Sequence, residues 1–221
     1  MNANSELAWA YLSRVHMCQG RPDLAIPELE NARLLVSIPA GFALHRGFAF
    51  MLARRHREAL ALLEEAEQKG VASPNTRGQA AIALTALGRR DEAIVQARTA
   101  LSPAPKTSWT VGMNALTDGL AAWTLARCGA HDEAGELVRG ILSLPVRHHF
   151  GAGFAVALLG DHDRGAELLA DCPQWIIDSV VLFERETGCF RGHAGFEALL
   201  RQLNATATLE SVRRVVDGAP A

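Results

Sequence analysis

Apolar side chains recur along the chain at intervals of three and four residues, which places them on one face of a helix. The predicted helices come in pairs, with a short turn between them. In the first pair, Gly20 suits the left-handed backbone that ends a helix, and Pro22 suits the first turn of the next helix. The apolar positions of this pair are Leu7, Ala8, Tyr11, Leu12 and Val15, then Leu24, Ala25, Leu29, Ala32 and Leu35. The pattern therefore predicts a helical hairpin.

A small residue marks the second helix of each pair and gives the chain its period. Ala25, Ala59 and Ala93 are separated by 34 residues each time. The corresponding small residues Ala134 and Gly165 follow after 41 and 31 residues. A fixed period of this size is typical of stacked helical hairpins. The wider gap falls in a connector rich in proline and serine between the third and fourth pairs.

These spacings divide the chain into repeats, a C-terminal region and a tail. The predicted units cover about residues 6–38, 40–72, 75–105, 108–145 and 148–172. Arg54 stands in unit two at the place of the turn glycine, so that turn must close without one. Residues 173–204 are expected to form capping helices, because the end of a stack needs a polar outer face. Residues 205–221 are expected to form a mobile tail.

The first unit carries a recognisable motif along both of its helices. Its residues are Trp9-x-x-Leu12-Ser13-x-x-His16, followed by Gly20, Ala25, Leu29 and Ala32. The motif resembles the tetratricopeptide repeat, whose pattern is W-x-x-L-G-x-x-Y, then A-x-x-x-F and a further A. Ser13 and Leu29 depart from it conservatively, whereas His16 makes the groove side of this unit more polar. The resemblance implies an all-α fold, a right-handed α-solenoid of about five such hairpins with capping helices at its C-terminal end.

In a tetratricopeptide solenoid, the first helix of each unit lines the concave face. The resemblance therefore assigns these candidate partner-binding residues: Tyr11 and Arg14 in unit one, Leu44, Phe48 and Met51 in unit two, Gln79 and Ile82 in unit three, Leu120 and Trp123 in unit four, and Phe150 and Phe154 in unit five. The set is apolar and aromatic, and it mostly lacks the Lys, Arg and Asn that clamp a peptide's terminal carboxylate in this family. The groove is expected to bind an apolar helix or an extended segment of a partner protein.

Two other arrangements remain open. The C-terminal helices can fold back and fill the groove, or the groove can close into a dry pocket for a small apolar ligand. An open groove, in contrast, would expose Phe48 and Trp123.

The C-terminal stretch 192–201 also resembles the D-P-R-F-x-x-L-L-R ending of tetratricopeptide regions in bacterial signalling proteins, such as class III nucleotide cyclases and winged-helix regulators. The matching residues are Phe196, Leu199, Leu200 and Arg201. This implies a regulatory region that binds its own effector domain.

Composition narrows the choice of partners. The chain has 221 residues, of which 49% are hydrophobic and 21% charged, and its formal net charge is −2. This balance predicts neither a nucleic-acid nor an anionic-membrane partner, and no apolar run approaches the ~20 residues that span a bilayer. The N-terminus lacks a signal-peptide pattern, and the four cysteines form no C-x-x-C pair. A reduced, cytoplasmic compartment is therefore expected.

The sequence predicts no enzyme, metal site or cofactor site. His131-Asp132 and His162-Asp163 each follow a turn glycine, where the aspartate favours the positive N-terminus of the next helix. His148 and His149 are adjacent, so they point to different faces of a helix. The chain has no phosphate-binding loop, nucleophile elbow or Rossmann fingerprint. It is interpreted as a scaffold that binds a protein or peptide.

Overall fold

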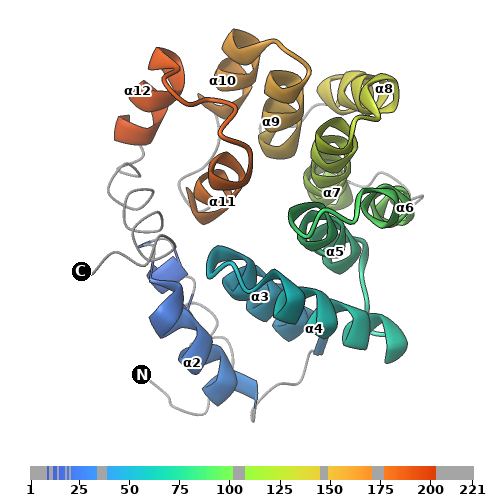
Figure 1. The fold of residues 1–221 in the computed structure, drawn as a ribbon, viewed down its shortest axis with the longest axis vertical. Coiled ribbons are helices and arrows are strands. Elements are labelled where there is room, and N and C mark those ends of the chain that lie inside the picture. The colour runs from blue at the N-terminus through green and yellow to red at the C-terminus, as the bar shows by residue number, and fades with distance from the viewer. Residues whose placement is uncertain are drawn as a thin grey trace.

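The computed structural model describes residues 9, 12–13, 15–17, 19, 21–33, 39–101, 108–144, 149–170 and 177–202. The regular elements in these ranges are helices, and none of the described residues lies in a strand. The prediction of an all-α fold is therefore confirmed. Figure 1 shows the helices following one another along a curved row, with α11 (Ile177–Thr187) on the inner side of the curve.

After α2 (Pro22–Arg33), the helices come in pairs, and each helix packs against the next along the row. The pairs are α3 (Pro39–Leu52) with α4 (His56–Gln68), α5 (Pro74–Ala86) with α6 (Arg90–Ala100), α7 (Ser108–Cys128) with α8 (His131–Leu142), and α9 (Phe150–Leu158) with α10 (His162–Ala170). The first helices also contact one another, α3 with α5, α5 with α7 and α7 with α9. This packing is that of a helical repeat, with the first helices forming the inner row (Figure 1).

The turn inside each of these pairs contains a residue in the left-handed region. Gly88, Gly129 and Gly160 have φ angles of 77°, 92° and 106°. In the α3–α4 turn the residue is Arg54, with a φ angle of 58°. A side chain in this conformation costs about 1 kcal/mol. The turn of unit two thus closes without a glycine, as the sequence requires, and it accepts some strain in doing so.

The small residues that set the period are buried where helices cross. Four of them have no exposed surface: Ala25, Ala59, Ala93 and Ala134. The fifth is Gly165, where an added Cβ would lie 2.7 Å from the carbonyl oxygen of Gly153. Non-bonded contacts of real Cβ atoms essentially never fall below 3.0 Å, so a larger residue would force the α9–α10 crossing to shift. Close approach of the paired helices therefore explains why these positions are small.

The two C-terminal helices take different places. The helix α12 (Ala194–Gln202) packs against α10 at the end of the row, and His193 Nε2 lies 2.9 Å from Asp163 Oδ1. The helix α11 lies inside the curve and does not extend the row as a cap (Figure 1). Its consecutive residues Val180 to Phe183 are at most 1% exposed, which requires burial on several sides. No helix among the described residues is long and apolar enough to cross a membrane.

Candidate binding groove

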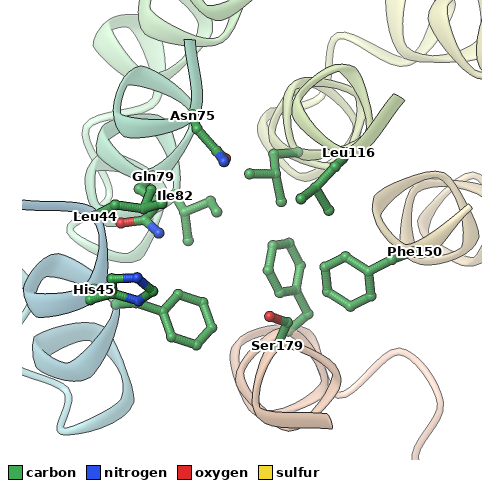
Figure 2. Close-up of a pocket in the computed structure, with 11 residues that line it drawn as sticks. Leu44, His45, Asn75, Gln79, Ile82, Leu116, Phe150 and Ser179 are labelled. Carbon is green, nitrogen blue, oxygen red and sulfur yellow. The ribbon is translucent and has the colours of Figure 1, made fainter. Parts of the chain in front are cut away.

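The inner faces of α3, α5, α7 and α9 form a groove, and a pocket remains in it beside α11 (Figure 2). The lining residues are Leu44, His45 and Phe48 of α3, Asn75, Gln79 and Ile82 of α5, Leu116 and Leu120 of α7, Phe150 of α9, and Ser179 and Phe183 of α11. Six of these were assigned to the concave face from the sequence: Leu44, Phe48, Gln79, Ile82, Leu120 and Phe150. The structure brings these six together around one space.

Phe183 of α11 inserts among aromatic rings from α7 and α9. Its ring centroid lies 4.7 Å from that of Trp123, 4.9 Å from that of Phe150 and 5.6 Å from that of Phe154. The contacts with Trp123 and Phe150 are edge-to-face, a geometry that aromatic pairs prefer. Trp123 is consequently only 1% exposed, and Phe154 has no exposed surface. Three predicted groove residues therefore form one cluster with a residue that the sequence analysis did not single out.

These contacts correct the expectation that an open groove exposes Phe48 and Trp123. Trp123 lies in the core because Phe183 packs against it, and Phe48 is half-buried beside the pocket. Of the arrangements that the sequence left open, the described residues adopt the one in which a C-terminal helix fills much of the groove. The available signal was the apolar run at 180–183, which predicts a buried helix but does not identify the surface that buries it.

Arg185 attaches the C-terminal part of α11 to the end of α3. Its guanidinium donates hydrogen bonds to the carbonyl oxygens of Met51, at 2.7 Å, and Leu52, and it pairs with Glu186 at 2.7 Å. The last carbonyls of a helix have no partner within it, so a cation stabilises them. Burial lowers the pKa of Arg185. Met51, a predicted groove residue, thus contributes its backbone carbonyl, while its side chain is fully buried.

The chain beyond α11 is held by contacts of its own. The backbone N–H of Phe190 donates to Glu184 Oε2 at 3.1 Å, and the Phe190 ring stacks on Phe196 of α12 at 4.5 Å. Burial raises the pKa of the Cys189 thiol to about 11, which keeps it protonated at neutral pH. This segment therefore has a structural role, and Cys189 lacks the lowered pKa of a reactive cysteine.

Space and hydrogen-bonding groups remain in the groove around α11. The pocket beside Phe183 has a volume of about 80 Å³. Gln79 Oε1 and Trp123 Nε1 are buried and have no hydrogen-bond partner among the described residues. A buried polar atom left without a partner costs roughly 1–3 kcal/mol. The space beside α11 is therefore unfilled, and Asn75 and Gln79 of α5 are among the polar residues that line it.

Neither the remaining predicted residues nor the comparisons with known proteins identify a further site. Tyr11 and Arg14 lie outside the described residues. Within the described ranges, no group of three or more His, Cys, Asp or Glu side chains is arranged to hold a metal ion. No family model matches the chain, and no curated protein matches it. The groove itself, with its aromatic cluster and its polar rim, is therefore the feature from which a function is argued.

Proposed function

We propose that this chain is a protein-interaction scaffold of the tetratricopeptide type, a right-handed solenoid whose concave groove binds a helical segment of a partner protein. The observation that supports this proposal is the position of α11 in the groove. The groove accommodates this helix by surrounding Phe183 with Trp123, Phe150 and Phe154. Burial of an aromatic anchor from a helix is the chemistry of helix-in-groove recognition.

The size of the remaining pocket disfavours a small molecule as the species bound beside α11. About 80 Å³ is less than the roughly 150 Å³ of a cavity that holds benzene, and ligand sites commonly reach several hundred Å³. A regulatory role is compatible with the proposal if the helix belongs to an effector domain. In both cases the groove recognises a protein segment.

The experiment compares two single variants in capture from the native lysate, followed by mass spectrometry. Phe48→Ala removes a half-buried ring beside the pocket, whereas Val95→Ala removes an apolar side chain from the exposed face of α6. We expect partners to be retained by the wild type and by Val95→Ala but lost with Phe48→Ala. Thermal melting of each variant checks that the fold is intact. Identical capture by all three proteins would contradict the proposal.

A further inference from the structure

We propose that α11 is an exchangeable occupant of the groove and that the partner is an amphipathic helix that takes its place. The replacing helix carries an aromatic side chain at the position of Phe183, a cation two residues later at the position of Arg185, and an amide or hydroxyl side chain near Gln79. This inference rests on the proposed function. It adds the chemistry of the partner and a regulatory step, because the groove opens only when a helix competes with α11.

The fit of α11 differs from that of the paired helices. An added Cβ on Gly151 would lie 2.2 Å from the backbone of Gly119, so α7 and α9 touch through their main chains. In contrast, α11 contacts its neighbours through side chains, which are those of the buried Val180 to Phe183 and of Arg185. The pocket of about 80 Å³ lies beside it. A helix held by side-chain contacts next to unfilled space is expected to open at lower free energy than the tightly packed hairpins.

Polar side chains also line the space that α11 leaves unfilled. Gln79 lines the pocket together with Phe183, and the indole of Trp123 packs edge-to-face on the Phe183 ring. Asn75 and Gln79 of α5 are polar residues that line this space. A helix with an amide or hydroxyl side chain beside its aromatic anchor can form hydrogen bonds with them in the space that α11 leaves unfilled.

The polar attachment of α11 can be reproduced by another helix. Arg185 binds backbone carbonyls of Met51 and Leu52, which accept a hydrogen bond from any suitably placed cation. Residues two positions apart face different sides of a helix. This explains how Phe183 contacts α7 and α9 while Arg185 contacts α3. The recognition pattern of the partner is therefore an aromatic residue, one variable residue and an arginine within a helix.

The test uses the full chain and a fluorescent peptide with the sequence of residues 177–187, measured by fluorescence anisotropy. Phe183→Ala weakens the internal helix while leaving the rest of the groove intact. We expect the peptide to bind the Phe183→Ala chain at least about tenfold more tightly than the wild type, because truncation of the ring raises the fraction of chains whose groove is open. A peptide with alanine in place of its phenylalanine should bind neither chain. The Val95→Ala chain is the control and should bind like the wild type.

Hydrogen exchange of the wild-type chain keeps the test decisive if Phe183→Ala folds poorly. We expect the amides of α11 to exchange at lower opening free energy than those of α5, α7 and α9. Two results would contradict the proposal that a partner helix replaces α11. One is that the α11 amides exchange hydrogen only through global unfolding. The other is that the peptide binds equally to the wild type and to folded Phe183→Ala. Failure of the proposed function is a separate result, because it appears as unchanged capture by Phe48→Ala.

Discussion

At the scale of a single residue, Arg185 forms the hydrogen bonds that attach α11 to the end of α3. Arg185→Met removes the donors to the carbonyls of Met51 and Leu52 and leaves the half-buried Glu186 without its cation. We expect the free energy of unfolding to fall by roughly 2–4 kcal/mol, because buried acceptors and a buried charge lose their partner. Chemical denaturation followed by circular dichroism measures the change.

The matched control for this prediction is Arg164→Met. Arg164 pairs with Glu167 at 2.8 Å on the exposed side of α10, and both side chains are more than half exposed. Exposed ion pairs contribute about 0–1 kcal/mol. A loss of stability in the control as large as that in Arg185→Met would show that the carbonyl contacts of Arg185 have no special role.

His56 gives the groove region a dependence on pH. Its side chain is 12% exposed and lies 3.8 Å from Glu186, and burial lowers the pKa of His56 in the folded chain. The unfolded chain therefore takes up the proton first as the pH falls below about 6.5, so this contribution to stability is lost on acidification. We expect wild type to lose more stability than His56→Gln between pH 7.5 and 5.5, as measured by urea unfolding. Equal losses would contradict the prediction.

At the scale of helices, the α7–α9 crossing depends on two facing glycines. In Gly151→Ala, the new Cβ would lie 2.2 Å from the carbonyl carbon of Gly119, and backbone cannot yield as a side chain does. We expect a loss of at least about 2 kcal/mol in the free energy of unfolding. Gly140→Ala in α8 is the control, because its Cβ would meet nothing within 4 Å. There, alanine should stabilise the helix by about 0.5–1 kcal/mol, and a loss at Gly140 would contradict the packing argument.

The helices and their pairing were predictable from local signals. The regular spacing of Ala25, Ala59 and Ala93 is visible in the sequence because these positions are fully buried and accept only small side chains. Six of the eleven residues assigned to the concave face line one pocket, since helical periodicity decides which side chains share a face. The position of α11 was not predictable from such signals. An apolar run specifies burial, whereas the surface that buries it depends on contacts between residues far apart in the chain, such as Phe183 with Trp123.

At the scale of the whole molecule, two kinds of contact hold the row of helices together. Each hairpin packs on its neighbours along the chain, as in other repeat architectures, where stability is a sum of local terms. The helix α11 adds contacts that skip along the row, since Arg185 binds the end of α3 while Phe183 packs on α7 and α9. We infer that α11 couples the N-terminal part of the row to its middle and C-terminal part.

This coupling predicts how the molecule unfolds when Phe183 is truncated. Phe183→Ala removes a fully buried ring and should cost about 3–5 kcal/mol. It should also lower the dependence of the unfolding free energy on urea, because hairpins without a bridging helix unfold in separate steps. Urea unfolding followed by circular dichroism and tryptophan fluorescence tests this. Leu63→Ala, a buried change within the α3–α4 hairpin, is the control and should shift the midpoint while both probes stay coincident. Coincident probes and an unchanged slope in Phe183→Ala would show that the row is cooperative without α11.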